Sequence, residues 1–270
     1  MITTYQKILK GEKIGIVFGT FAPMHQGHLD VIMRAKKECD GGCIVIVDGR
    51  DDDRGAKAGM PLKKRYRYIR GFFADDDLVA VYPVDETALG IPAYPNGWYG
   101  FIRAVEEIFK NGTKDGTSVF YVSEPEYSDF LNNIGYEVVL LDRNENPISA
   151  TMIRENPIKY WDYITYPFRR VFSKNILICG TASEGKTTLV KDLGKYFNAP
   201  YSHEYARQYM EESYVSEWEL DGADYLAFVD GQYQLNKKMI CSPANHGIFF
   251  ADSDSMTTRM YAEYYCKDPT

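Results

Sequence analysis

The sequence predicts an α/β protein of two domains, each built on a parallel sheet. Short apolar runs alternate with charged segments whose apolar residues recur at helical spacing, the pattern of a parallel sheet covered by helices. A second strand–loop–helix unit starts near residue 175, and 270 residues exceed the commonest size of one domain. We place the domain boundary at Ser173, which gives domains of residues 1–172 and 173–270.

The first half contains a regular alternation of strand and helix signals. Short apolar runs of this kind are typical of strands that are buried on both faces. We expect strands at Lys13–Gly19, Cys43–Asp48, Leu78–Pro83, Ser118–Val122 and Glu137–Leu141, and helices at Leu29–Lys37, Pro61–Phe73, Gly97–Lys110 and Pro125–Asn133. Two short acidic runs, Asp51–Asp53 and Asp75–Asp77, we interpret as solvated turns.

The second half repeats the pattern on a smaller scale. We expect a strand at Asn175–Cys179, a helix from Lys186 and a further strand at Gly247–Ala251. The segment 157–172 joins the halves and is aromatic and basic rather than rich in Gly and Ser. It therefore predicts a packed helical connector, not a flexible linker.

Composition excludes several classes of protein. Hydrophobic residues make up 45% and charged residues 26%, which is ordinary for a globular chain. A net charge of −7 argues against nucleic-acid binding as the main activity, and no apolar run is long enough for a signal peptide or a membrane span. Five scattered cysteines, Cys39, Cys43, Cys179, Cys241 and Cys266, contain no C-x-x-C pair. We expect free thiols in a cytoplasmic protein with no nucleic-acid or membrane partner.

The segment G-T-F-A-P-M-H-Q-G-H, from Gly19 to His28, lies between the first predicted strand and the first predicted helix. Gly19 and Gly27 let the backbone approach a ligand closely. His25 and His28 are three residues apart, so they share one face of the opening helical turn. Unpaired N–H groups at a helix start attract anions, and imidazoles can donate to oxygens that gain charge in a transition state. This segment predicts a polyphosphate site.

A second motif, I-S-A-T-M-I-R from Ile148 to Arg154, ends the same half. Ser149 could cap a helix, and Ser149 and Thr151 offer hydroxyl groups. Arg154 would direct a guanidinium group toward phosphate oxygens.

The second half carries a phosphate-binding loop. Gly180–Thr187, G-T-A-S-E-G-K-T, fits the P-loop pattern G-x-x-x-x-G-K-[ST] between a predicted strand and a predicted helix. Lys186 would reach the β- and γ-phosphates, and the Thr187 hydroxyl would face Mg²⁺. Glu184 places a negative charge in this loop.

Acidic residues follow the last predicted strand. In Gly247–Asp254, Asp252 would hold Mg²⁺ and Asp254 would lie near the substrate. Glu204 could accept a hydroxyl proton, or it could form an ordinary helix ion pair with Arg207. His203 and His246 we interpret as structural.

The H-x-G-H and I-S-x-T-x-I-R motifs resemble those of a nucleotidyltransferase superfamily. Further segments resemble the bifunctional nicotinamide-nucleotide adenylyltransferase and ribosylnicotinamide kinase family of the NadR type. They are Arg50–Gly55, Lys63–Arg70, Tyr94–Trp98 and Pro147–Pro157, and the resemblance covers nearly the whole chain. It implies a Rossmann-like nucleotidyltransferase domain followed by a P-loop kinase-like α/β domain.

The resemblance implies that the first half transfers AMP from ATP to nicotinamide mononucleotide, which gives NAD and pyrophosphate. His25 and His28 would hold the ATP phosphates, Arg154 would stabilise the leaving pyrophosphate, and Trp98 would stack on the nicotinamide ring. Mg²⁺ would bridge phosphates. Arg54 and Lys63 would contact phosphate, unless they are simply solvated charges.

The second half would phosphorylate the 5′-hydroxyl of nicotinamide riboside with ATP, and its product is the acceptor of the first half. Lys186, Glu204 and Asp252 would be its catalytic residues, with Arg207 and Asp254 near the riboside. Across both sites, the residues expected to bind ATP are Gly19, Thr20, Phe21, Gly27, Ser149, Thr151, Gly180, Ser183, Gly185, Lys186, Thr187 and Thr188.

Two departures from the family pattern modify this expectation. Too few residues precede the first strand for a helix-turn-helix, so we expect no repressor function. The chain ends soon after the second acidic motif, so we expect a C-terminally incomplete kinase half. Two alternatives stay open: an adenylyltransferase for another phosphorylated acceptor, and a nucleotide-sensing regulator whose P-loop binds ATP without turnover. The resemblance also allows a homo-oligomer.

Overall fold

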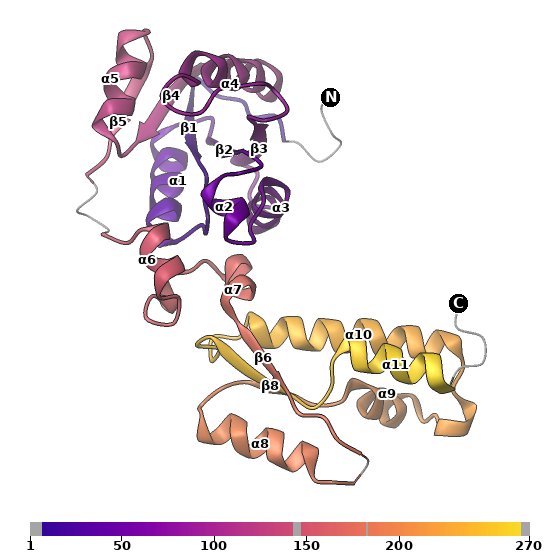
Figure 1. Ribbon diagram of the computed structural model, residues 1–270. Coiled ribbons are helices and arrows are strands. Elements are labelled where there is room, and N and C mark those ends of the chain that lie inside the picture. The colour runs from indigo at the N-terminus through magenta and orange to yellow at the C-terminus, as the bar shows by residue number, and fades with distance from the viewer. Residues whose placement is uncertain (1–6, 143–146, 182, 266–270) are drawn as a thin grey trace. The chain divides into compact units, whose positions relative to one another are not determined.

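The computed structural model describes residues 7–142, 147–181 and 183–265 (Figure 1). The chain divides into two compact units, Met1–Val171 and Phe172–Thr270. This division lies one residue before the predicted boundary. Cys266, Ala182 of the P-loop and most of the N-terminal segment tested for a signal peptide lie outside the described residues.

Unit 1 contains a parallel sheet of five strands in the order β3-β2-β1-β4-β5. The strands are β1 (Lys13–Gly19), β2 (Cys43–Gly49), β3 (Val79–Asp85), β4 (Thr117–Val122) and β5 (Glu137–Leu140). All five predicted strands are confirmed, with small shifts at their ends. The order reverses beside β1, and in such sheets the crevice outside the strands' carboxyl ends is the usual ligand site.

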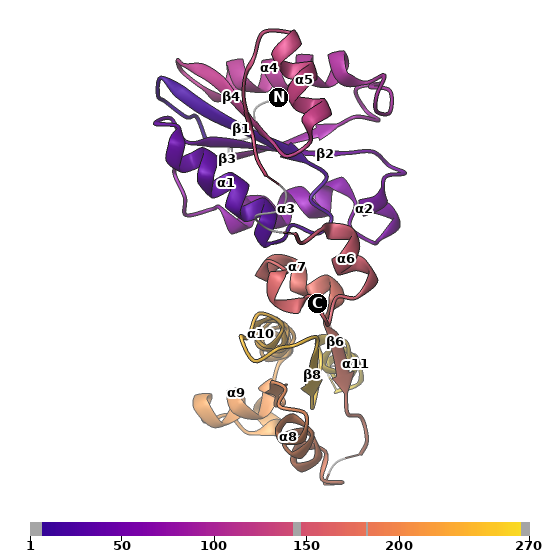
Figure 2. The ribbon, with the colours of Figure 1, turned by 90° about the vertical axis from the view of Figure 1, so that its left-hand side faces the viewer.

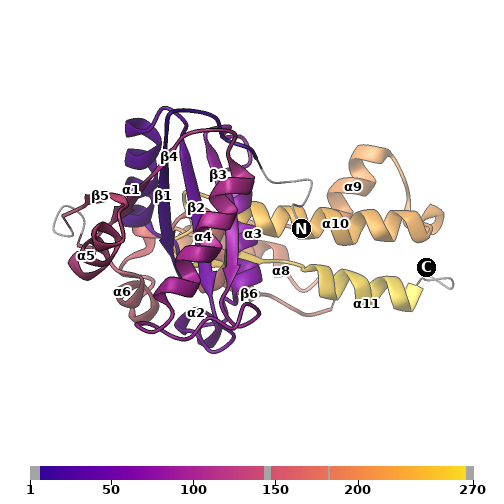
Figure 3. The same cartoon turned by 90° about the horizontal axis from the view of Figure 1, so that it is seen from above.

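Helices cover both faces of this sheet. The helices of unit 1 are α1 (Gln26–Glu38), α2 (Arg54–Lys57), α3 (Leu62–Phe72), α4 (Trp98–Gly112), α5 (Pro125–Asn133), α6 (Ala150–Glu155) and α7 (Tyr166–Phe172). Figure 2 shows α1 and α3 on one face and α4 and α5 on the other, and Figure 3 shows α4 lying across the strands. The predicted helical connector is confirmed by a 3₁₀ turn at Trp161–Tyr163 and by α7, with Trp161 and Phe168 buried.

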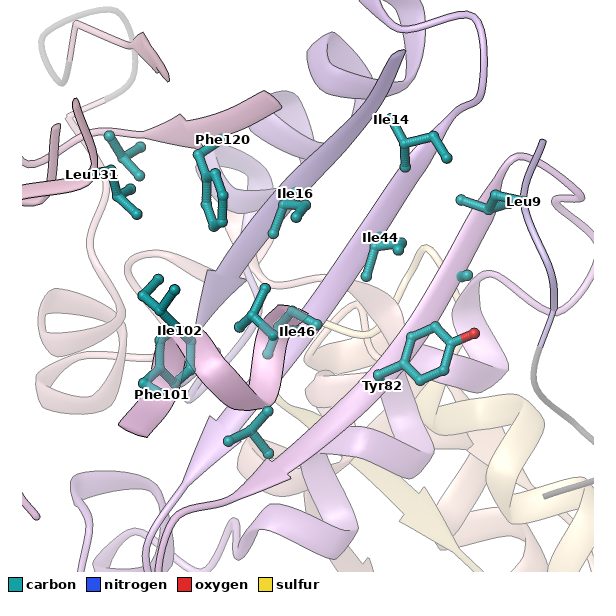
Figure 4. Close-up of a cluster of buried hydrophobic side chains, with 14 of the residues drawn as sticks. Leu9, Ile14, Ile16, Ile44, Ile46, Tyr82, Phe101, Ile102, Phe120 and Leu131 are labelled. Atoms are coloured by element: carbon teal, nitrogen blue, oxygen red, sulfur yellow. The ribbon is translucent and has the colours of Figure 1, made fainter. Parts of the chain in front are cut away.

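The core of unit 1 lies between the sheet and the α4–α5 face (Figure 4). Because side chains alternate across a strand, every second residue of β1 and β2 points to this face. Ile14 and Ile16 do so on β1, and Ile44 and Ile46 do so on β2. Phe101 of α4 packs onto them.

Unit 2 contains three parallel strands in the order β6-β8-β7. They are β6 (Lys174–Leu177), β7 (Tyr201–Ser202) and β8 (Ile248–Ala251), and the helices are α8 (Lys186–Tyr196), α9 (Tyr205–Ser213), α10 (Gly222–Ile240) and α11 (Ser255–Tyr265). The strand predicted at Asn175–Cys179 starts one residue earlier and ends at Leu177, where the chain turns into the P-loop. In Figure 1, α8 lies on one side of this sheet and α10 on the other.

The described residues also bear on the predictions about cysteines and membrane spans. Cys39, Cys43, Cys179 and Cys241 are free thiols, as predicted. Within those residues, no helix has the length and apolar character needed to cross a membrane.

Candidate functional site

The carboxyl ends of the strands in unit 1 surround a cavity of about 810 Å³. Its walls come from the loops that follow β1, β2, β3, β4 and β5 and from the start of α6. Most residues predicted for the first site line it, namely Gly19, Thr20, Phe21, His25, Gly27, His28, Arg54, Trp98, Ser149 and Thr151. Segments that lie far apart in the sequence therefore meet in one cavity.

The two histidines stack at the start of α1. His25 is the last residue before the helix and His28 lies in its first turn, with ring centroids 3.8 Å apart. The His25 backbone N–H donates to His28 Nδ1 at 3.4 Å. This contact places the proton of a neutral His28 on Nε2.

His25 is buried without a partner for one of its ring nitrogens. His25 is only 5% exposed, and within the described residues its Nδ1 has no hydrogen-bond partner. Burial lowers the pKa of His25 to about 4, so the ring is neutral at neutral pH. A buried polar atom without a partner costs free energy, so a polar atom of a molecule bound in this cavity would stabilise His25.

The I-S-A-T-M-I-R motif forms the start of α6 and connects it to the histidine loop. Ser149 caps the helix by accepting the Met152 N–H at 3.2 Å, as predicted. Arg154 donates to the Ala22 carbonyl oxygen at 2.5 Å and to Thr151 Oγ1 at 3.0 Å. Arg154 contacts the wall of the cavity rather than lining it. Burial and the nearby charge of Arg54 lower the pKa of Arg154, so these two cations converge.

A buried arginine organises the loop that carries Arg54, and the sequence reasoning missed it. Arg65 is fully buried and pairs with both carboxylate oxygens of Asp53, at 2.7 and 3.1 Å. It also donates to the Asp48 backbone oxygen at 2.9 Å. Asp53 in turn accepts the Ala56 N–H at 2.7 Å and so starts α2. The interpretation of Asp51–Asp53 as a solvated turn is therefore wrong at Asp53, because a buried cation holds its carboxylate.

The aromatic side of the cavity centres on Trp98. Its ring stacks on Phe130 at 4.8 Å and meets Tyr127 edge-on at 4.9 Å. Trp98, Tyr94 and Tyr127 all line the cavity. Lys63 does not, because it lies exposed on α3. The role predicted for Lys63 therefore has no support from its position.

Several carboxyl groups that the sequence reasoning did not single out also line the cavity, and burial raises the pKa of two of them, Asp48 and Glu86. Asp48 lies one residue before the end of β2 and accepts the Thr20 hydroxyl at 3.1 Å. Burial, and then the charge of Glu86, raise the pKa of Asp48 to about 7. Burial also raises the pKa of Glu86, although Arg50 lies 3.7 Å away. Asp48 could have been identified from the sequence, because it is an acid at the end of the predicted strand Cys43–Asp48.

In unit 2, two side chains of the P-loop form hydrogen bonds with the backbone of the same loop. The Glu184 carboxylate accepts the Thr181 N–H at 3.1 Å, and Lys186 Nζ donates to the Thr181 carbonyl oxygen at 2.7 Å. The hydrogen bonds from Thr181 lower the pKa of Glu184. Ser183 and Gly185 have φ of 66° and 80°, the left-handed conformation that leads the loop into α8. Gly180, Ser183, Gly185 and Thr188 are exposed.

The predicted magnesium ligands lie together. Thr187 Oγ1 donates to Asp252 Oδ2, across 65 residues of sequence. Asp252 is only 8% exposed, and its Oδ1 has no hydrogen-bond partner within the described residues. A hydroxyl beside a carboxylate with an unpartnered buried oxygen fits Mg²⁺, which prefers oxygen ligands and keeps several waters. The described residues contain no group of three or more His, Cys, Asp or Glu arranged to hold a metal.

The other residues predicted for unit 2 make structural contacts. Glu204 and Arg207 form the ordinary helix ion pair, at 3.6 Å. Asp254 accepts the Thr257 N–H at 2.8 Å and so caps α11. His203 contacts Gln208 at 2.7 Å, which agrees with a structural role. The buried Gln232 accepts the N–H of Tyr205 and ties α9 to α10.

Comparisons with known proteins agree with this arrangement. Residues 16–156 match the cytidylyltransferase-like family, and residues 175–270 match the AAA domain family. A crystal structure of NadR protein in complex with NR is 42% identical, with a TM-score of 0.83, over 97% of this chain and 73% of that chain. This chain belongs to the NadR family. A NadR structure in complex with NAD and AMP-PNP is also 42% identical, with a TM-score of 0.81, over 97% and 76% of the two chains.

Two curated NadR proteins are more distant. The trifunctional NAD biosynthesis/regulator protein NadR of Salmonella typhimurium is 31% identical over 94% of this chain. The Escherichia coli protein of the same name is 30% identical over 93% of this chain. The chain spans 63% of the length of each. The predicted family and the predicted pair of α/β domains are thereby confirmed.

Proposed function

We propose that unit 1 transfers AMP from ATP to nicotinamide mononucleotide and releases NAD and pyrophosphate. The observation that carries this proposal is the buried His25, whose Nδ1 has no hydrogen-bond partner within the described residues, beside His28 in a cavity of about 810 Å³. The NadR structure in complex with NAD and AMP-PNP supports ATP and the dinucleotide as ligands of this family.

The chemistry requires positioning and charge stabilisation rather than a protein nucleophile. An oxygen of the acceptor phosphate forms a bond with the α-phosphorus of ATP. The bond from that phosphorus to the β-phosphate oxygen breaks, and pyrophosphate leaves with its electron pair. His25, whose ring is neutral, and His28 donate hydrogen bonds to phosphate oxygens, and Arg154 offsets the charge that develops on the leaving group. Mg²⁺, when bound with the nucleotide, would supply further neutralisation of charge.

For unit 2 we propose a site that binds MgATP and phosphorylates the 5′-hydroxyl of nicotinamide riboside. Lys186, Thr187 and the unpartnered oxygen of Asp252 support nucleotide and metal binding. Glu204 lies at the start of α9 and is the candidate for accepting the hydroxyl proton. The family's complex with NR supports the riboside as a ligand.

One observation favours a second function for unit 2, namely nucleotide binding without turnover. Glu184 occupies the Thr181 N–H and Lys186 is held by the Thr181 carbonyl, so both donors are engaged within the loop.

We place the protein in the cytoplasm, where both nucleotide substrates are available.

An assay with purified protein and MgATP tests these proposals. The acceptor is either nicotinamide mononucleotide or nicotinamide riboside, and NAD and the mononucleotide are quantified. NAD from the mononucleotide supports the function of unit 1, and no product from it would refute that function. Product from the riboside supports the kinase. ATP binding without riboside turnover supports the second function.

A further inference from the structure

The connector, residues 157–172, contacts the histidine loop, which is residues 20–25 between β1 and α1. Ile164 of the connector pairs with His25 in an isolated antiparallel bridge. Thr165 follows, and its hydroxyl donates to the Met24 carbonyl oxygen at 2.9 Å, across 141 residues of sequence. The Thr165 backbone N–H donates to the same oxygen at 3.4 Å. The two residues that end the histidine loop are therefore both held by the connector.

The contact between Thr165 and Met24 is buried. Met24 is fully buried, and Thr165 is only 7% exposed. Hydrogen bonds gain strength where water is excluded, and a buried carbonyl oxygen that loses a donor costs free energy. The Thr165 hydroxyl therefore fixes the position of the backbone at Met24.

Thr165 is itself anchored to the body of unit 1. Its carbonyl oxygen accepts the Phe168 N–H at 2.9 Å, in the turn that leads into α7. Phe168 is fully buried, and its ring meets Tyr68 of α3 edge-on at 5.4 Å. Helix α3 contacts β2 and β3, so the connector holds the loop from a fixed position on the sheet and its helices.

The conformation of the histidine loop depends on contacts from outside the loop. Phe21 has a φ of 47°, the left-handed region that costs free energy for a residue other than glycine and persists where surrounding contacts hold it. Arg154 of α6 supplies one such contact, to the Ala22 carbonyl oxygen. Thr165 supplies another, but it is uncharged and is not among the residues that line the cavity.

We propose that Thr165 is a positioning residue for adenylyl transfer, because its hydroxyl holds Met24 and so keeps His25 and His28 in place at the cavity wall. This inference rests on the proposed function of unit 1. Hydrogen-bond donors act on developing charge when they are in place before the reaction, and a displacement of about 1 Å can cost about 100-fold in rate. The effect belongs to kcat, since these donors stabilise the transition state more than the bound substrates.

The test removes the hydroxyl and keeps the shape of the side chain. In the full chain, Thr165→Val should lower kcat for NAD formation from nicotinamide mononucleotide about tenfold, with KM for either substrate changed less than about twofold. Thr165→Ser keeps the hydroxyl and should restore most of the rate. Thr113→Val is the matched control, because the Thr113 hydroxyl donates to the Phe109 carbonyl oxygen at 2.8 Å and lies outside the cavity lining. It should keep the wild-type kcat.

A double-mutant cycle with His28→Ala separates positioning from a general loss of structure. Thr165→Val should lower kcat about threefold or less in His28→Ala protein, because part of what Thr165 positions is then absent. The same tenfold loss in both backgrounds would overturn the inference. A wild-type kcat in folded Thr165→Val would overturn it too, and so would an equal loss in Thr113→Val.

Two further outcomes have a defined meaning. If Thr165→Val does not fold, Thr165→Ala, which lacks the hydroxyl and adds no bulk, is measured by the same criteria. Wild-type protein that makes no NAD from nicotinamide mononucleotide would instead refute the proposed function on which the inference rests.

Discussion

The two glycine-rich loops of this chain follow the same local plan and differ in their surroundings. Each leaves the first strand of a parallel sheet and enters a helix, α1 in unit 1 and α8 in unit 2. In unit 1 the loop lies in a cavity, and His25 is buried beside it with an unpartnered nitrogen. In unit 2 the loop is exposed, and Glu184 and Lys186 both contact Thr181.

The difference teaches that a nucleotide site depends on the elements that enclose its loop. Hydrogen bonds are stronger where water is excluded, so the enclosed histidine loop can act on developing charge. Contacts between exposed charges are screened by salt and change with little cost in free energy. The P-loop can therefore exchange its internal contacts for a ligand.

We expect the largest effect from removal of the buried cation Arg65, which lowers the free energy of unfolding of unit 1. Arg65→Met leaves the Asp53 carboxylate without its cation, and breaking a buried pair this way costs about 3–5 kcal/mol. Urea unfolding followed by tryptophan fluorescence reports unit 1 through Trp98 and Trp161. Lys64→Met, which removes a partly exposed cation on the same helix, should change stability by less than about 1 kcal/mol. Equal effects of the two variants would contradict the role of Arg65.

The next effect tests the donors of the histidine loop. His28→Ala should lower kcat for NAD formation about 100-fold or more, because loss of one transition-state donor has this magnitude. The rate is measured with nicotinamide mononucleotide and MgATP. His246→Ala removes an exposed histidine of unit 2 and should leave the rate unchanged. A near-normal rate for His28→Ala would remove this residue from the proposed mechanism.

The burial of His25 predicts a dependence of stability on pH. The folded-state pKa is about 4, below the ordinary value of 6.5, so between these values the unfolded chain binds a proton that the folded chain excludes. The His25 contribution is therefore complete above pH 6.5 and is lost as the pH falls toward 4, by roughly 3 kcal/mol in all. Asp48, whose folded-state pKa is raised to about 7, contributes with the opposite sign.

For that reason the pH test is a difference between two proteins. The free energy of unfolding is measured between pH 7.5 and pH 4.5 for wild type and for His25→Gln, which cannot take up the proton. We expect the wild type to lose more stability than the variant as the pH falls. Parallel curves would show that His25 titrates normally.

We expect the smallest effect from a change in the P-loop of unit 2, where Glu184 affects the affinity for ATP. Glu184→Gln removes the carboxylate that accepts the Thr181 N–H, and we expect ATP to bind this unit about two- to fivefold more tightly. Titration calorimetry of the full chain measures this affinity, with the heat that remains in Lys186→Ala subtracted as binding outside the P-loop and with the exposed Glu211→Gln as control. Weaker or unchanged binding would mean that Glu184 does not compete with the nucleotide.

Lys186→Ala should abolish this binding and leave NAD formation from the mononucleotide intact.

Local features were predictable because they depend on neighbours in the chain. The apolar runs of unit 1 became β1 to β5, and the predicted loops precede α1 and α8 as expected. Two helices were missed for identifiable reasons. Helix α2 is one short turn started by the Asp53 carboxylate, and α10 buries only Phe228 and Gln232, so it has little apolar periodicity.

The sequence by itself determined most of the strands and helices and the two strand–loop–helix motifs, because periodicity and spacing are properties of neighbouring residues. The family was predicted from the resemblance of these motifs to known sequences. Only the tertiary structure decided which charges are buried. Arg65 and Asp53 are twelve residues apart yet share one buried pair, and Asp48 and Trp98 line one cavity although they lie on different elements. Burial sets the cost of a charge, and burial depends on contacts between distant segments.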